Sequence, residues 1–232
     1  MKKFSLKSPL ADIRALYDAF DAPLTALDCG QMCALHNPSG KPFCCDICHA
    51  VPAAYQQEWN FLREKTDLWH SWRGDECKAG ADAEKLRDET PDNMVLLACL
   101  GPQACQRMYR ALSCRQFPFF PYVTADFRFV GLAFEWEFAP VCWVIQNPDA
   151  VTDVYRQQFV ALHDRLFALE QEIFESYAIH SARMREVYAA HRRRILLLHR
   201  AGGWRLISPG SGRMAMMRGG KCVAPGSWTK SR

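Results

Sequence analysis

Apolar residues recur with helical spacing in the first third of the chain. The first stripe predicts a helix that begins after Ser8 and ends before Pro23, because proline suits the first helical position and a later proline stops the helix. A second stripe predicts a helix from Pro52 to Trp72. Residues 74–92 are polar and weakly periodic, which is typical of a surface segment with one short helix.

The middle of the chain has a strand-like pattern instead. Residues 122–144 are rich in aromatic and β-branched types, and Phe134, Trp136 and Phe138 alternate with glutamates as in a half-buried strand. Gly131 is suited to a bend or a bulge between two strands. We therefore expect a strand pair in this segment.

Helical spacing returns after Asn147 and continues to about His199. One straight helix of that length would extend roughly 75 Å at 1.5 Å per residue, so we expect a break near His180–Ser181. Residues 201–232 contain six Lys or Arg and no acid, with many Gly, Ser and Pro, which predicts a disordered basic tail. The rest of the chain sums to −2, with 23 bases against 25 acids, so the net charge of +4 comes from the tail.

These patterns together predict a mainly α protein with a small β hairpin and cysteine-rich loops packed on helices. We expect three parts. Residues 1–148 form a cysteine-cluster metal-binding domain, residues 149–200 form a C-terminal helical region, and residues 201–232 form the basic tail.

Cysteine is the residue type that changes this picture most. The chain has 11 cysteines, and eight of them fall in two groups. The candidate metal ligands are Cys29, Cys33, Cys44, Cys45 and Cys48 in the first group, and Cys99, Cys105 and Cys114 in the second. Thiolates are soft, strongly donating ligands, so the groups predict zinc or an iron–sulfur cluster.

A disulfide framework is the rival interpretation, and composition weighs against it. Disulfide-stapled domains are mostly short secreted chains, whereas this chain has 232 residues and is 49% hydrophobic, enough to bury a core. The first residues lack an apolar run of signal-peptide length, and the longest apolar runs are too short to span a bilayer. We therefore expect a cytoplasmic protein without a membrane segment.

The spacing of the cysteines leaves the kind of centre open. Cys45-Asp46-Ile47-Cys48 can fold both sulfurs toward one ion, but the other spacings are irregular. Two four-cysteine sites, one such site with spare thiols, and one polynuclear cluster such as 4Fe–4S all fit. Irregular spacing and a distant last ligand favour an iron–sulfur cluster, whereas zinc is the commoner structural staple.

Other candidates are weaker. His36 and His49 lie beside the first group, where we expect solvent-exposed side chains because thiols are already in excess. Cys142 lies in an apolar run and is expected to be a packing residue, and Cys222 a thiol of the tail. Cys77 lies among charged residues, which argues against metal ligation.

The residues of both groups resemble a known pattern: Cys29, Cys33, the Cys44-Cys45 doublet, Glu58 on the next helix, Cys99, Leu100, Cys105, Tyr109, Cys114, Arg115, Phe117 and Pro118. This pattern is similar to that of the YkgJ-type cysteine-cluster family, described as zinc- or iron-chelating proteins. The resemblance covers Cys29 to Pro121, and Cys-Arg-x-Phe-Pro is its most specific part. The chain departs from the family in the wider spacing of its first pair and in Ala111-Leu112, which replaces an Arg-Pro step.

The resemblance implies metal chelation by a carrier, sensor or scaffold, with a metal ion or cluster as ligand and a protein as partner. The alternative is an S-adenosylmethionine-dependent protein lysine N-methylase, because the flagellin lysine N-methylases resemble the same family and are thought to use an iron–sulfur centre. Nucleic acid is expected to bind only weakly, through the basic tail. Residues 27–43 contain few large apolar side chains, so we also expect metal–thiolate bonds to hold these loops.

Overall fold

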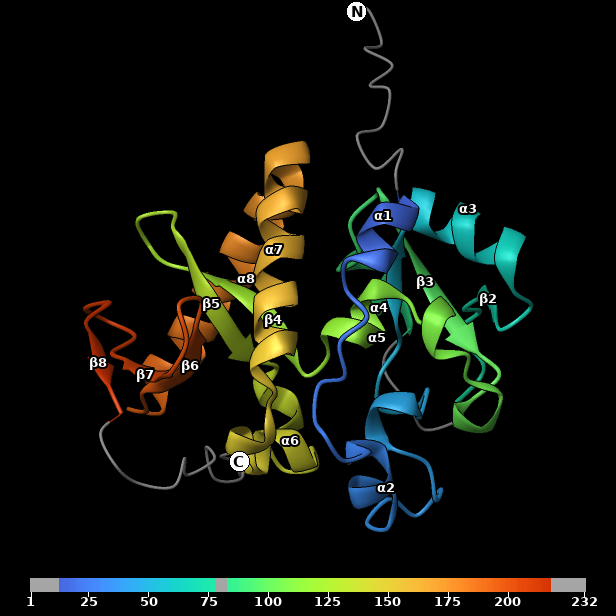
Figure 1. Cartoon of the computed structure of the whole chain (residues 1–232), viewed down its shortest axis with the longest axis horizontal. Coiled ribbons are helices and arrows are strands. Elements are labelled where there is room, and N and C mark those ends of the chain that lie inside the picture. Colours follow the sequence, from blue (N-terminus) through green and yellow to red (C-terminus); the bar gives the residue numbers. More distant parts are fainter. Residues whose placement is uncertain (1–12, 78–82, 218–232) are drawn as a thin grey trace, which may run out of the picture. The chain divides into compact units, whose positions relative to one another are not determined.

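The computed structural model describes residues 13–77 and 83–217 and shows a mixed α/β protein (Figure 1). Of these residues 44% are helical and 18% lie in strands, which form two antiparallel sheets of three and five strands. The expectation of a mainly α fold with a small hairpin is therefore wrong. Ser8 and Cys222 lie outside the described residues.

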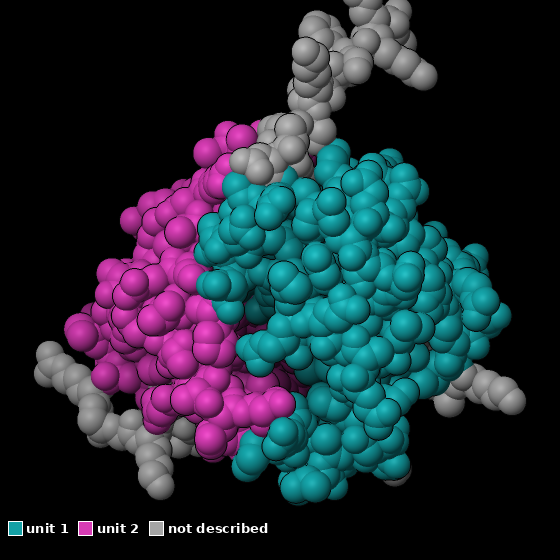
Figure 2. All heavy atoms as spheres, turned by 45° about the vertical axis from the view of Figure 1, so that its right-hand side comes forward, with its two compact units in different colours: residues 1–21, 30–115 teal, residues 22–29, 116–232 magenta. Residues whose placement is uncertain are grey.

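The chain forms two compact units, shown in two colours in Figure 2. The first comprises residues 1–21 and 30–115, and the second comprises residues 22–29 and 116–232. The strands predicted for the middle of the chain thus belong with the C-terminal helices and not with the cysteine groups.

The first unit contains a short sheet with helices and turns around it. Its elements are α1 (Ile13–Asp18), α2 (Cys29–Ala34, whose first residue belongs to the second unit), η2 (Phe43–Cys45), β1 (Ala53–Tyr55), α3 (Gln56–Lys65), β2 (Trp69–Ser71), α4 (Ala83–Asp88), β3 (Met94–Cys99), η3 (Pro102–Ala104), η4 (Arg107–Tyr109) and α5 (Leu112–Gln116, whose last residue belongs to the second unit). The strand order is β1-β3-β2, so β3 is the central strand.

The helix predicted from Pro52 to Trp72 is much shorter in the structure. Its ends are strands: Ala53 pairs with Leu96 in β3, and Trp69 pairs with Cys99. Pairing with the apolar strand β3 outweighs the local helical pattern at both ends, because tertiary context overrides weak propensity. Only the ten central residues, which form α3, remain helical.

The second unit has a five-stranded sheet in the order β4-β5-β6-β7-β8. Its elements are β4 (Phe119–Val123), β5 (Phe129–Phe134), η5 (Trp136–Phe138), α6 (Trp143–Gln146), η6 (Pro148–Ala150), α7 (Asp153–Leu169), α8 (Gln171–Ala190), β6 (Ile195–His199), β7 (Trp204–Ile207) and β8 (Met214–Met216). Strands β7 and β8 lie in the part of the chain that we predicted to be a disordered tail.

Three further details of the prediction are wrong. The long helical region breaks at Glu170 and not near His180–Ser181, and it ends at Ala190, before the strand β6. Trp136 lies in a short 3₁₀ helix after β5 and not in a strand. The bulge suggested for Gly131 is confirmed, because the pairing of β4 with β5 shifts from Tyr122–Gly131 to Val123–Phe129. A Cβ atom on Gly131 would come 2.3 Å from the carbonyl oxygen of Leu198, so glycine also permits the close approach of β6.

Helix α8 packs on β4, and the core of the second unit lies between them and the neighbouring strands. Its buried residues are Phe120, Tyr122, Val130, Ala133, Trp136, Met184, Tyr188, Ile195, Leu197 and Ile207. The apolar run at Ile195–His199 that suggested helix is thus the central, buried strand β6, which explains its continuous hydrophobicity.

His163, on α7, is an unusual member of this unit because its imidazole is completely buried. Its Nδ1 lies 2.9 Å from the carbonyl oxygen of Phe159, and within the described residues its Nε2 has no hydrogen-bond partner. Aromatic rings surround it, from Phe129, Phe159, Phe167 and Tyr177. Burial lowers the pKa of His163 to about 4, although the Phe159 carbonyl partly opposes this shift.

We predict that His163 makes the free energy of unfolding depend on pH. The histidine binds a proton near pH 6.5 in the unfolded chain but only near pH 4 in the folded chain. Between these values the unfolded chain holds more protons, so the free energy of unfolding should fall by about 3 kcal/mol as the pH drops from 7 to 4. Urea titrations at several pH values measure this loss.

His163→Phe should remove this part of the pH dependence while keeping an aromatic ring in the cluster. His191→Phe, which replaces an exposed histidine of the same unit, should retain it. Equal pH slopes for His163→Phe and the original chain would refute the assignment.

Candidate metal centre

Four of the predicted ligands come together in the first unit from four separate elements. Cys45 is the last residue of η2, Cys99 ends β3, Cys105 directly follows η3, and Cys114 lies in α5. Their charges interact. Charge on Cys45 or Cys105 raises the pKa of Cys99, and charge on Cys45 or Cys99 raises the pKa of Cys114. The structure thus joins one member of the first cysteine group to all three of the second. We call these four residues the thiol group.

Arg110 provides the positive charge of the thiol group. Its Nε donates a hydrogen bond to the Sγ of Cys105 at 3.1 Å. Burial alone would lower the pKa of Arg110, but the hydrogen bond to Cys105 and the charges of Cys105, Cys45 and Cys114 raise it on balance. The guanidinium therefore stays charged next to the sulfur atoms.

Cys99 and Cys114 are harder to ionise than ordinary thiols. Burial raises the pKa of Cys99, and the charges of Cys45 and Cys105 raise it further. Burial also raises the pKa of Cys114 far above that of an ordinary thiol, and the charges of Cys45 and Cys99 add to the effect, whereas Arg110 opposes it. Both thiols are therefore kept in the neutral form, and one guanidinium does not offset the charge that their ionisation would add.

The four thiols suit a soft metal, but in this structure their sulfur atoms are not placed to bind one ion together. Thiolates from Cys45, Cys99, Cys105 and Cys114 would fit zinc or an iron–sulfur cluster in number and in chemistry. Among residues 13–77 and 83–217, however, no three Cys, His, Asp or Glu side chains are placed to hold one metal ion. The sulfurs must move closer together before they can share an ion.

Of the remaining predicted ligands, Cys44 adjoins the thiol group and the others lie apart from it. The Sγ of Cys44 is 4.0 Å from that of Cys45, whereas Cys33 is buried with its Sγ 3.6 Å from the carbonyl oxygen of Gly30. Cys29 belongs to the second unit, where burial and then the Cys29 charge raise the pKa of Tyr155.

Cys48 forms a disulfide with Cys77, so its sulfur is not a thiolate ligand in this form of the chain. Cys48 was expected to bind the metal, and Cys77 was expected to have no role as a ligand. His36 and His49 are exposed, and Cys142 is buried, as expected.

The loop that carries Cys44, Cys45 and Cys48 is organised by the buried carboxylate of Asp46. This carboxylate accepts hydrogen bonds from the Ser39 hydroxyl at 2.7 Å, the Asn37 amide at 3.1 Å and the Cys48 backbone N–H at 3.1 Å. Burial would raise its pKa, but these hydrogen bonds lower it overall. An acceptor two residues before a backbone N–H is typical of an Asx turn, and that signal was present in the sequence.

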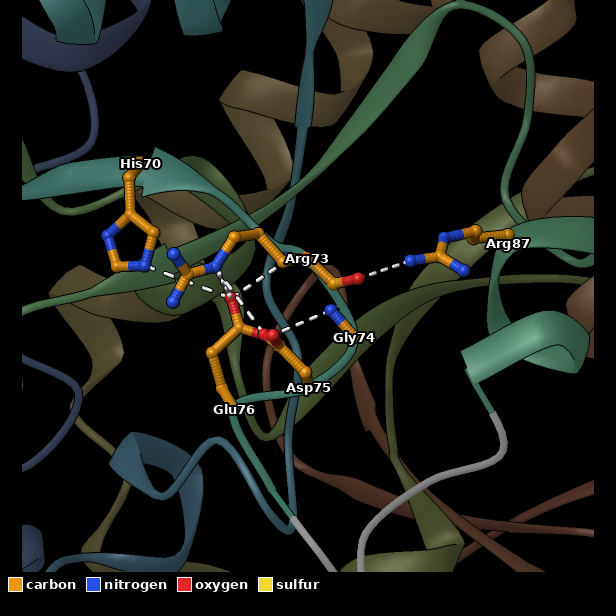
Figure 3. Close-up of polar contacts among 6 residues, drawn as sticks. All are labelled: His70, Arg73, Gly74, Asp75, Glu76 and Arg87. Carbon is orange, nitrogen blue, oxygen red and sulfur yellow. Dashed lines mark hydrogen bonds and ion pairs between the residues drawn. The ribbon is translucent and has the colours of Figure 1, made fainter.

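The turn before Cys77 is organised in the same way by Glu76, as Figure 3 shows. Its carboxylate accepts hydrogen bonds from the backbone N–H groups of Arg73 and Gly74, both at 2.8 Å, and lies 3.9 Å from the Nε2 of His70. Burial would raise the pKa of Glu76, but these backbone hydrogen bonds lower it. Arg87 donates to the carbonyl oxygen of Arg73 and closes the turn from the other side.

Glu58 anchors the element that carries Cys114. It is buried in α3, and its carboxylate accepts hydrogen bonds from the Tyr17 hydroxyl at 2.7 Å, the Leu112 backbone N–H at 2.6 Å and the Tyr55 backbone N–H at 3.3 Å. Burial raises the pKa of Glu58, although all three donors oppose this shift. One carboxylate thus ties α1, the start of α3 and the start of α5 together.

Arg115, next to Cys114, completes this anchor. Its guanidinium donates to the carbonyl oxygens of Tyr17 at 2.8 Å, Phe20 at 2.6 Å and Met108 at 2.6 Å, and it lies over the Tyr17 ring at 4.2 Å. The arginine of the Cys-Arg-x-Phe-Pro segment therefore has a structural role, which the sequence pattern marked but did not explain.

Comparison of the chain with family models, with curated proteins and with solved structures gave no match. The function is therefore inferred from the residues of the thiol group and their surroundings.

We predict that removal of the Glu58 carboxylate strongly destabilises the first unit. Glu58→Ala leaves the Tyr17 hydroxyl and the backbone N–H of Leu112 without their acceptor in a buried place, which should lower the free energy of unfolding by about 3 kcal/mol. Glu64→Ala changes an exposed glutamate of the same helix and should shift it by less than about 0.5 kcal/mol. Urea unfolding of both variants tests this, and equal effects would contradict it.

Proposed function

We propose that the chain is a metal-binding protein that holds zinc or an iron–sulfur cluster through Cys45, Cys99, Cys105 and Cys114. The observation that supports this most is that thiols from four elements, separated by up to 69 residues (114 − 45), interact with one another, and that three of them act on the guanidinium of Arg110. Four interacting thiols with a single cation nearby are chemically suited to a metal, whose positive charge would offset the thiolates.

The surrounding residues have definite tasks in this proposal. Arg110 donates a hydrogen bond to the sulfur of Cys105 and so orients this donor. Glu58 and Arg115 fix the position of α5 and thereby that of Cys114. A bound zinc would supply a structural staple, and a bound cluster would supply redox or sensing chemistry. The roles of carrier, sensor and scaffold, which the resemblance implies, all use the same centre.

The proposal also includes the location of the protein in the cell. None of the described helices is long and apolar enough to cross a membrane. We propose a cytoplasmic location, because thiolate centres persist where thiols are kept reduced. We also propose that the chain binds a protein partner.

The methylase alternative uses the same centre and adds a substrate. It requires that the metal-loaded chain bind S-adenosylmethionine, which equilibrium dialysis of the loaded chain measures. Binding would favour the methylase, whereas its absence in a fully loaded chain would favour a carrier, sensor or scaffold.

We predict that Cys45→Ser and Cys114→Ser each lower metal affinity by about 100-fold or more, since loss of a direct ligand should cost at least as much as loss of its supporting hydrogen bond. Zinc competition with a chromogenic chelator measures affinity. Anaerobic iron and acid-labile sulfide analysis distinguishes a cluster from zinc.

Cys222→Ser is the matched control, because Cys222 is not among the predicted ligands, and it should keep full metal content. If Cys45→Ser and Cys114→Ser both bind zinc and iron as well as the original chain, the proposed centre is wrong.

A further inference from the structure

The segment Cys45-Asp46-Ile47-Cys48 connects two different sulfur chemistries. Cys45 belongs to the thiol group around Arg110, whereas Cys48 is bonded to Cys77. Two cysteines separated by two residues can face a single ion, and the sequence marks them as such a pair. In this form of the chain the sulfur of Cys48 is part of the disulfide and cannot bind a metal.

The disulfide is accessible to a reductant in solution. Cys48 is exposed, and Cys77 is partly exposed. Thiol–disulfide exchange requires in-line access of an attacking thiolate to one sulfur, which an exposed cysteine allows without unfolding. Exposed disulfides of this kind are more often labile or regulatory than purely structural.

Both ends of the disulfide are held by contacts that do not involve its sulfurs. Asp46 accepts the backbone N–H of Cys48, and Glu76 accepts the N–H groups that shape the turn before Cys77 (Figure 3). These carboxylate-centred turns should persist when the bond between the sulfurs breaks. Each cysteine then keeps the local backbone shape from which the bond can form again.

We propose that the Cys48–Cys77 disulfide is a redox switch on the metal centre. A dithiol reductant gives up two electrons and two protons; the bond between the two sulfurs breaks, Cys48 and Cys77 become thiols, and the reductant becomes a disulfide. Cys48 is then available as a further sulfur donor beside Cys45. This inference rests on the proposed function and adds its regulation.

The sign of the switch follows from the geometry. In the disulfide form the sulfurs near Arg110 do not converge on one point among the described residues. Reduction removes the covalent tie between the cysteine loop and the turn at Glu76 and also adds a donor. Both changes favour metal binding, so the reduced chain binds metal more tightly than the oxidised chain.

The test compares zinc affinity in four forms of the full chain. They are the oxidised chain, the chain reduced with dithiothreitol that is then removed without oxygen, Cys77→Ser, and the double variant Cys48→Ser/Cys77→Ser. Peptide mass spectrometry confirms the disulfide in the oxidised chain. Competition with a chromogenic chelator gives the affinity for Zn²⁺ alone in each form.

Reduced chain and Cys77→Ser should bind zinc at least about tenfold more tightly than the oxidised chain, because both offer the Cys48 thiol. The double variant, which lacks both the tie and the Cys48 thiol, should bind less tightly than the reduced chain and Cys77→Ser. Equal affinity in all four forms would overturn the switch, and tight binding by the double variant would overturn the role of Cys48 as a donor.

Failure of the switch is distinguishable from failure of the metal centre itself. If Cys45→Ser and Cys114→Ser lose zinc while all four redox forms bind alike, the centre stands and the switch is wrong. If no form binds zinc or iron, the proposed function is wrong.

Discussion

A buried carboxylate with three donors is the constraint on which the first unit depends. Burial of the Glu58 carboxylate costs much free energy unless its oxygens accept hydrogen bonds. The donors come from Tyr17, Tyr55 and Leu112. These residues lie in α1, at the start of α3 and at the start of α5. Because the requirement is met only when all three elements are in place, it also fixes where the Cys114 thiol lies.

The cysteine loop shows a second use of the same physics. We expected metal–thiolate bonds to hold this loop, since it offers few large apolar side chains. In the structure, hydrogen bonds to Asp46 and the disulfide of Cys48 already restrain it. A bound metal would therefore add to an existing framework and would not create the loop from a disordered segment.

The sequence predicted the parts of the fold that local periodicity determines. Helix α1, the short helix α4 and the helical character of residues 153–190 follow from apolar spacing or from polar composition. The strands β1 and β2 could not be predicted, because each has three residues and exists through pairing with β3. Strand β3 itself is a continuous apolar run, which fits a buried strand or a buried helix equally well.

The candidate site was predictable in composition but not in connectivity. The sequence predicted that all eight cysteines of both groups gather, whereas in the structure only Cys45, Cys99, Cys105 and Cys114 act on one another beside Arg110. The partner of Cys48 could not be predicted, because Cys77 follows a charged turn whose shape depends on the Glu76 carboxylate. The spacing of apolar residues does not predict such a turn.

The anchor at Arg115 also sets an order of events when the chain is made. Its contact with Tyr17 spans 98 residues, so α1 leaves the ribosome long before the guanidinium that will hold it. At roughly 5–20 residues per second, the interval is on the order of 5–20 s. The cysteine loop is also synthesised within this interval, ahead of β3 and α5. During these seconds the local turn around Asp46 is the restraint that the nascent loop already carries.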